Sequence, residues 1–179
     1  RNFDISRLRF FSENIDTIYM NKEKIYFVEL KKDIIKKHKP YFEKYDLNGK
    51  MIIRKDNNPS PENESEYVKV KFNLNQKNIS KNEDIYIYGE LTNWAISPKY
   101  ALKYNSKGNM FSAEILLKQG YYNYYYVTLN EKGEISTFLT EGNHFETNNE
   151  YTIYVYYKSP WEHHERLIGL EKITSNALN

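Results

Sequence analysis

The sequence contains no cysteine: none of its 179 residues is Cys. No disulfide framework can form, and no thiolate can serve as a nucleophile or as a metal ligand. A run of about 18 apolar residues is missing as well, so the sequence predicts no membrane-spanning helix. The lack of cysteine is compatible with the cytoplasm and with the periplasm, and it selects neither.

Neither sign of charge dominates the sequence. Lys and Arg number 26 against 24 Asp and Glu, a formal net charge of +2, and 28% of the residues are charged. A mixed surface of this kind is not the basic field of a nucleic-acid-binding protein, so we predict no nucleic-acid partner. Because the sequence begins at Arg1 rather than at Met, we expect a processed or partial chain from which any secretory signal has been removed.

Tyrosine is abundant, with 18 Tyr against two Trp. Tyr favours strands and provides a broad contact area with a polar tip. We interpret most of these residues as half-buried positions in β-sheets. The alternative, which stays open, is that some form an aromatic recognition surface for protein or for sugar.

Alternation of apolar and polar residues predicts strands along most of the chain. The predicted strands cover residues 3–6, 8–11, 15–20, 25–30, 51–53, 68–74, 84–89, 111–117, 121–129, 135–139 and 151–157. Short polar turns separate most of them, and residues 31–39 are expected to be a basic loop or a short helical turn. Strands at this spacing indicate an all-β fold, a β-sandwich, without a long helix.

The most distinctive stretch is 84–94, D-I-Y-I-Y-G-E-L-T-N-W. Gly89 ends a strand, and a polar bend then returns the indole of Trp94 to the protein. This arrangement recurs at one edge of immunoglobulin-like sandwiches related to glycogen-binding domains. We therefore predict that Gly89 and Trp94 are structural anchors and that Trp94 is a core residue. Its replacement by Ala would then lower stability by ~3–5 kcal/mol.

The strongest linker signal is 56–65, D-N-N-P-S-P-E-N-E-S, which holds two prolines and no apolar residue. We place a domain boundary or a long loop there.

Two histidine-containing segments could carry chemistry. In 161–166, W-E-H-H-E-R, adjacent histidines point in different directions and rarely ligate one ion, so we interpret this segment as a solvated polar loop. In 141–146, E-G-N-H-F-E, a general acid–base pair is conceivable. No nucleophile elbow, phosphate loop or metal motif accompanies it. We predict no enzymatic activity, no cofactor and no metal site.

Several ordered motifs resemble the plug protein family of the Bacteroidota type IX secretion system. They are Y-D-L-N-G-K-M-I-I at 45–53, Y-G-E-L-T-N-W at 88–94, L-K-Q-G-Y-Y-N-Y at 117–124, E-G-N-H-F-E-T-N-N-E-Y-T at 141–152 and R-L-I-G at 166–169. The resemblance covers nearly the whole chain, and it implies that the N-terminal part of the longer family members is missing. It also implies the end of a first β domain plus linker over 1–65, an immunoglobulin-like (early-set) β-sandwich over 66–158 and a C-terminal extension over 159–179.

The resemblance implies a role without catalysis. The protein would be a periplasmic subunit, associated with the outer membrane, that occludes the periplasmic opening of a large outer-membrane β-barrel translocon. A rigid sandwich with tyrosine-rich faces can seal a wide opening through a broad, partly wet interface. The mean hydropathy of −0.82 fits a reversible contact of that kind. Membrane contact is expected only through the barrel.

A glycan-binding module is the alternative function. The segment 88–94 and Thr147-Asn148-Asn149 resemble glycogen-binding domains, and Tyr125 and Phe138 could serve as stacking platforms for a sugar near Asn148 and Asn149. Those domains carry a lysine at the position that Tyr125 occupies here, which weakens this hypothesis.

A third alternative is a scaffold that adds a client strand to an exposed edge at 67–74. The charges of Lys69 and Lys71 argue against such pairing.

Overall fold

The computed structural model describes residues 1–10, 12–40, 47–55, 65–75, 77, 79–130, 132–144 and 149–175, with the side chains of 149, 150 and 175 left out. Apart from two 3-10 turns, Glu90–Thr92 (η1) and Pro98–Tyr100 (η2), the regular elements of this part of the chain are strands. The predicted all-β fold is therefore confirmed. The chain forms two compact units, one of Arg1–Lys39 with Lys44–Asn143 and one of Pro40–Glu43 with His144–Asn179.

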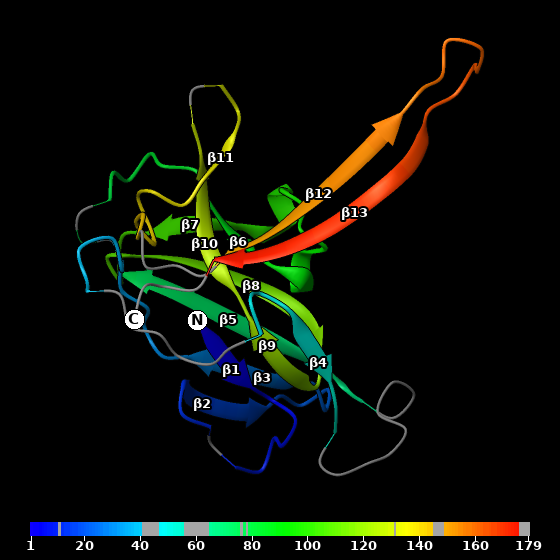
Figure 1. Cartoon of the computed structure of the whole chain (residues 1–179). Helices are drawn as coiled ribbons and strands as arrows, with labels where there is room; N and C mark the ends of the chain where they lie inside the picture. Colours follow the sequence, from blue (N-terminus) through cyan, green and yellow to red (C-terminus); the bar gives the residue numbers. More distant parts are fainter. Residues whose placement is uncertain are drawn as a thin grey trace. The chain divides into compact units, whose positions relative to one another are not determined.

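The first unit contains a larger and a smaller sheet (Figure 1). Its strands are β1 (Asn2–Asp4), β2 (Ile15–Met20), β3 (Tyr26–Leu30), β4 (Met51–Ile53), β5 (Tyr67–Asn75), β6 (Ile85–Tyr88), β7 (Ala101–Asn105), β8 (Met110–Lys118), β9 (Gly120–Asn123), β10 (Tyr125–Leu129) and β11 (Ile135–Ser136). The larger sheet has the order β11-β10-β6-β7-β8-β5-β3-β2, and the smaller has the order β1-β9-β4.

Strand β5 shows why these residues form a sheet with one dry face. Val68, Val70 and Phe72 are fully buried, whereas the alternating Lys69 and Lys71 are partly exposed on the other face. Strand β5 pairs with β8 on one side and with β3 on the other. Its edges are therefore occupied, and the strand-addition alternative at 67–74 is wrong.

The two sheets pack face to face through aromatic side chains. The Phe3 ring on β1 lies 5.6 Å from Phe72 of β5, edge to face, and Tyr124 lies 5.1 Å from the same Phe72 ring. The chain passes from the smaller to the larger sheet at Tyr124, which separates β9 from β10. These contacts produce the predicted sandwich character.

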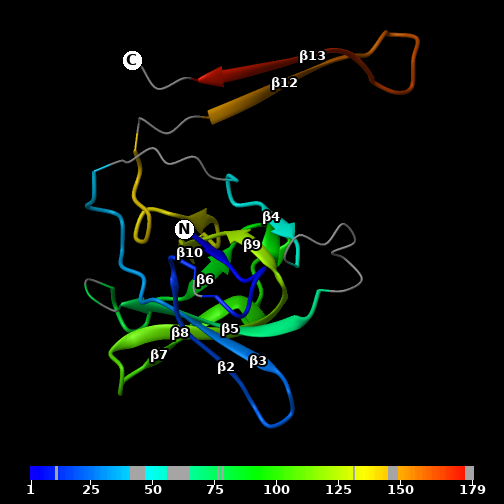
Figure 2. The ribbon, with the colours of Figure 1, turned by 90° about the horizontal axis from the view of Figure 1, so that it is seen from below.

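The predicted boundary at residue 65 does not separate two sheets. Strand β3 pairs in parallel with β5, and β4 pairs with β9, so strands from both sides of residue 65 share the same sheets (Figure 2). Within the predicted linker, 56–64 lie outside the described residues. Proline and asparagine in that segment signal a loop, but they carry no information about which strands pair on either side.

The second unit contains β12 (Asn149–Tyr157) and β13 (Arg166–Ser175), paired antiparallel with a register shift at Val155/Tyr156. We predicted 151–157 as the last strand of the sandwich and 159–179 as an extension. The structure instead pairs 149–157 with 166–175 in a unit of their own. Among the described residues, no helix is long and apolar enough to cross a bilayer.

Candidate functional site

Gly89 lies at a corner where three backbone segments meet. Its φ of 149° and ψ of −171° belong to a region that is open essentially to glycine alone. A Cβ at this position would lie 2.9 Å from the Gly49 carbonyl oxygen and 3.1 Å from that of Asn123. The next residue, Glu90, donates its N–H to the Gly49 oxygen at 2.8 Å, and its carboxylate accepts from the Met51 N–H at 2.7 Å. Close backbone approach thus explains this glycine.

Trp94 is not the core residue that we predicted, because its side chain is 41% exposed. Asn93 and Trp94 both have left-handed φ angles, of 52° and 55°. These two residues turn the chain so that the indole lies over the Gly49 turn. A Cβ on Gly49 would approach the indole Cη2 to 2.6 Å. Trp94 therefore covers a backbone turn at the surface and leaves one side open to solvent.

Three aromatic side chains form what we call the Trp94 cluster: Tyr88, Trp94 and Tyr125. Tyr88 and Tyr125 are direct partners on β6 and β10, with ring centroids 5.5 Å apart. The Trp94 ring lies 5.6 Å from Tyr88 and 6.4 Å from Tyr125. The two hydroxyl groups and the indole N–H make no hydrogen bond with the residues that the structure describes. Burial, with smaller contributions from Tyr88 and Glu141, raises the pKa of Tyr125.

The remaining glycan candidates are Phe138, Asn148 and Asn149. Phe138 follows β11 and is exposed, with the Lys37 ammonium 3.9 Å from its ring centroid, and it makes no ring contact with Tyr125. Asn148 lies outside the described residues. Asn149 begins β12, where its backbone pairs with Ser175. The structure thus adds Tyr88 and Trp94 to Tyr125 and leaves Phe138 apart.

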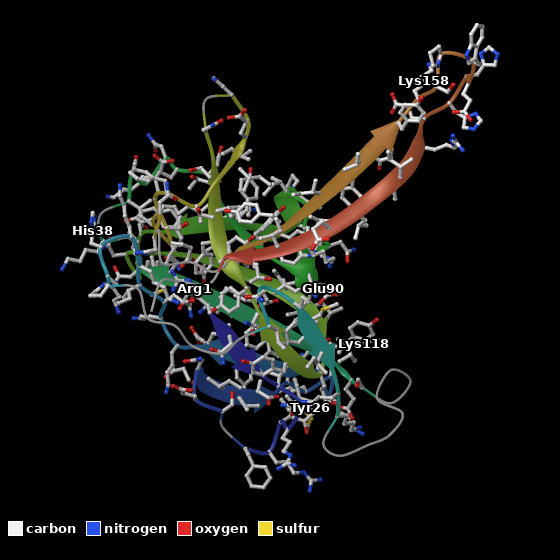
Figure 3. The ribbon with its side chains drawn as sticks, viewed as in Figure 1. Arg1, Tyr26, His38, Glu90, Lys118 and Lys158 are labelled. Atoms are coloured by element: carbon white, nitrogen blue, oxygen red, sulfur yellow. The ribbon has the colours of Figure 1, made fainter. Side chains whose placement is uncertain are left out.

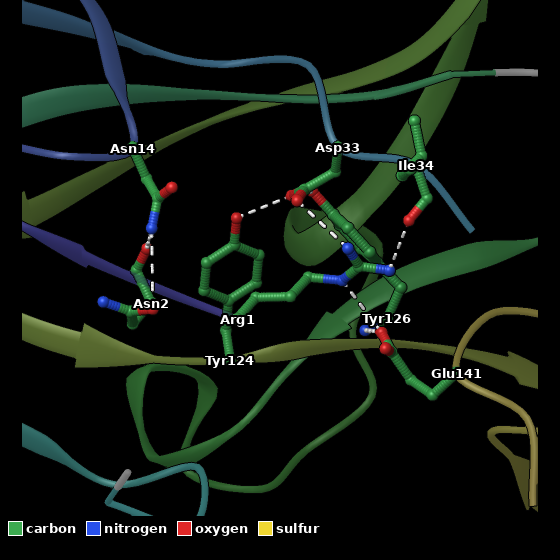
Figure 4. Close-up of polar contacts among 8 residues, drawn as sticks. All are labelled: Arg1, Asn2, Asn14, Asp33, Ile34, Tyr124, Tyr126 and Glu141. Carbon is green, nitrogen blue, oxygen red and sulfur yellow. Dashed lines mark hydrogen bonds and ion pairs between the residues drawn. The ribbon is translucent and has the colours of Figure 1, made fainter. Parts of the chain in front are cut away.

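A buried polar group, which we call the Arg1 cluster, was not predicted (Figure 4). Its members are Arg1, Asp33, Tyr124, Tyr126 and Glu141. The Arg1 guanidinium is 3.0 Å from the Asp33 carboxylate and 2.9 Å from that of Glu141, and the Arg1 side chain is 4% exposed. The hydroxyls of Tyr124 and Tyr126 donate to Asp33 Oδ2 at 2.7 and 2.9 Å.

The opposite charges within the Arg1 cluster compensate for the cost of removing its charged groups from water. Burial opposes the charged form of Arg1, but the carboxylates of Glu141 and Asp33 raise its pKa. Burial also raises the pKa of Tyr124 and Tyr126 well above the usual value, so both hydroxyls stay protonated as donors. Glu141, a candidate for acid–base chemistry, is thus engaged in a structural ion pair. No local motif could reveal this, because Arg1 and Glu141 are 140 residues apart.

The pair β12–β13, which we call the ribbon, exposes apolar side chains on both of its faces. Along β12 the exposed large apolar residues are Tyr151, Ile153, Tyr154, Val155, Tyr156 and Tyr157, and along β13 they are Leu167, Ile168, Leu170 and Ile173. Figure 3 shows side chains projecting along both strands of the ribbon, with Lys158 where β12 ends. Soluble proteins rarely leave so many neighbouring apolar side chains uncovered unless they form an interaction site.

The turn of the ribbon contains the histidine pair. Trp161 is 91% exposed there, and Arg166 lies 3.3 Å from the Glu162 carboxylate. His163 and His164 are exposed. No group of three or more potential metal ligands occurs in the described ranges.

Comparison with known proteins gives an informative structural similarity. No protein-family model and no curated protein matches the chain. A crystal structure of a hypothetical protein from Parabacteroides merdae ATCC 43184 is 30% identical, with a TM-score of 0.88. The match covers 98% of this chain and 44% of that protein, so the chain spans less than half of the length of its structural relative. The similarity supports the all-β fold over almost all of the chain.

Proposed function

We propose that this chain is part of a non-enzymatic periplasmic subunit that plugs the periplasmic opening of the type IX outer-membrane translocon. The proposal starts from the motifs at 45–53, 88–94, 117–124, 141–152 and 166–169, which resemble the plug family. The observation that supports it best is the ribbon, because a protein that seals an opening needs an exposed contact surface.

The chemistry of the ribbon suits a contact between proteins. Tyr and Trp dominate the energetic centres of interfaces, and each joins an apolar ring to a polar tip. The tyrosines of β12 and the exposed Trp161 supply such groups. An interface of this composition is broad and partly hydrated, and it can form and release without catalysis.

The experiment is to tag the native protein in its own cells, solubilise outer membranes gently and identify co-purifying proteins by mass spectrometry. We expect a very large β-barrel in near-equal amount. Tyr156→Ser should reduce its recovery at least fivefold, whereas the matched control Tyr67→Ser should not. Tyr156 is 58% exposed on the ribbon and Tyr67 is 57% exposed on β5. Recovery of no barrel would reject the plug function.

The exposed Trp94 cluster supports a second candidate, glycan binding. Aromatic faces beside hydroxyl and indole N–H groups that bond to no described residue offer both stacking and hydrogen bonds to a sugar. The test is retention of the purified chain on an α-glucan column. Retention that is lost in Tyr125→Ala, without a change in melting temperature, would favour this function. Free passage of the unaltered chain would exclude α-glucan as the ligand.

A further inference from the structure

The two outer edges of the ribbon differ in charge. Residues 151–157 of β12 contain no charged side chain, whereas β13 carries Arg166, Glu171 and Lys172. Charged residues protect an exposed edge against pairing with another strand, and an uncharged, β-branched and aromatic edge invites it. The described residues place no third strand beside β12. Strand β12 is therefore the edge that is open to pairing.

We propose that β12 pairs antiparallel with β12 of a second copy of this chain, around a two-fold axis at Tyr154. The resulting sheet has the order β13-β12-β12-β13. An isolated two-stranded hairpin is at best marginally stable in water, and three or more strands with an apolar face are needed for independent stability. Self-pairing supplies those strands without any further protein, through an interface that is the same on both copies.

The sequence of β12 is nearly the same in both directions about Tyr154. A two-fold axis there places Ile153 opposite Val155 of the other copy, so that two β-branched residues meet. It places Tyr151 opposite Tyr157, and Tyr154 opposite itself. Aromatic and β-branched cross-strand pairs are those that stabilise antiparallel sheets.

The charges that flank this uncharged segment fit the same register. The axis at position 154 sets position 150, a glutamate within β12, opposite position 158 of the other copy, a lysine one residue beyond the end of β12. Opposite charges directly across a sheet are favourable, and like charges are unfavourable. The symmetry produces two such pairs per dimer. The symmetry of the β12 sequence and the charges at its ends thus both favour a second β12 as the partner strand.

The first test is disulfide cross-linking, for which the absence of native cysteine is an advantage. Directly opposed residues of antiparallel strands have Cα atoms ~4.5–5.5 Å apart, within the range that a disulfide spans. Tyr154→Cys should give a covalent dimer under mild oxidation. The matched control is Leu170→Cys: Leu170 pairs with Tyr154 on β13, and both are 54% exposed. Its two copies would be about 14 Å apart, three strand spacings, and should not cross-link.

The second test exchanges the flanking charges, with mass measured by light scattering over a concentration series. The unaltered chain should approach twice 21.6 kDa. Glu150→Lys and Lys158→Glu should each raise the dimer dissociation constant roughly five- to tenfold, and the double variant should restore it. Circular dichroism of each variant checks that the fold is kept.

Three results would overturn the proposal. The first is a single 21.6 kDa species at every concentration. The second is a dimer in which Leu170→Cys cross-links and Tyr154→Cys does not. The third is a dimer whose dissociation constant does not respond to the charge exchange. Each result is independent of whether a translocon barrel co-purifies with the native protein.

Discussion

At the scale of single residues, the Gly89 corner is the most sensitive position. Gly89→Ala should lower the free energy of unfolding by about 2–5 kcal/mol, since it adds strain at φ 149° and a Cβ clash 2.9 Å from the Gly49 oxygen. Urea unfolding measures the change. The control is Gly133→Ala, at φ 77° with no atom within 4 Å of the new Cβ, which should cost about 1–2 kcal/mol. Equal losses would contradict the close-approach argument.

Trp94→Ala tests whether Trp94 covers a turn at the surface, as the structure shows, or fills the core, as the sequence predicted. Because the indole is half-exposed, we expect a loss of about 1–2 kcal/mol in chemical unfolding. Phe72→Ala, which empties a fully buried site, should cost about 3–5 kcal/mol. A Trp94→Ala loss as large as that of Phe72→Ala would restore the original core interpretation.

Tyr126, in the Arg1 cluster, makes the stability of the protein depend on pH in the alkaline range. Its pKa is raised in the folded state above the ordinary 10.0, mainly by burial and then by Tyr124 and Asp33. The unfolded chain therefore loses this proton first, so stability is full below about pH 10 and falls as the pH rises further. Tyr126→Phe should cost about 1 kcal/mol at pH 7 but make the decline above pH 10 shallower.

Urea unfolding between pH 7 and pH 11 measures both effects of Tyr126→Phe. The control is Tyr19→Phe, which makes the same chemical change at an exposed ring on β2. Identical slopes for Tyr126→Phe and the unaltered protein would reject the linkage.

At this scale, local pattern could identify Gly89, because a glycine between a strand and a polar bend signals an unusual backbone. It could not tell that Trp94 stays half-exposed, since that depends on the left-handed turn at 93–94 and on Gly49. The Arg1 cluster could not be predicted from the sequence, because its ion pairs join residues that are far apart in the chain.

At the scale of elements, alternation predicted most strands of the chain, but it missed β7 and β13, and the described part of the predicted strand 8–11, residues 8–10, is a turn instead. Strand β7 is short, and it pairs with β6 through Ala101 and Leu102 and with β8 through 103–105. The period of β12 is that of a strand with a buried face. In the structure both faces of β12 are exposed. Periodicity predicts that a segment forms a strand, but it does not predict which element, if any, covers that strand. Pairing partners are set by long-range packing, which one sequence does not reveal.

The ribbon should exchange its backbone amides much faster than the sandwich. Strand β5 has a neighbour on both sides and a buried face, whereas β12 has β13 as its described partner and exposed side chains. Hydrogen–deuterium exchange at low protein concentration should give β12 at least 100-fold less protection than β5, because local opening needs less free energy. Equal protection at high dilution would show that the ribbon is stabilised by something other than another copy.

At the scale of the whole molecule, the chain holds two units of different character. The first has a buried core to which strands between residue 2 and residue 136 contribute side chains. The second exposes, on the ribbon, large apolar side chains of the kinds that form the core of the first. The similar protein from Parabacteroides merdae is more than twice as long, and this fold matches 44% of it.

The pairing of β1 has a consequence for synthesis on the ribosome. Strand β1 is translated before the other strands of this sandwich, yet its partner β9 spans Gly120–Asn123, and Arg1 meets Glu141. Domains fold as units once their sequence is complete, and long-range pairing is slow. Strand β1 therefore remains without its partner β9 until most of the sandwich has been translated, and throughout that interval Phe3 lacks the contacts that bury it in the folded unit.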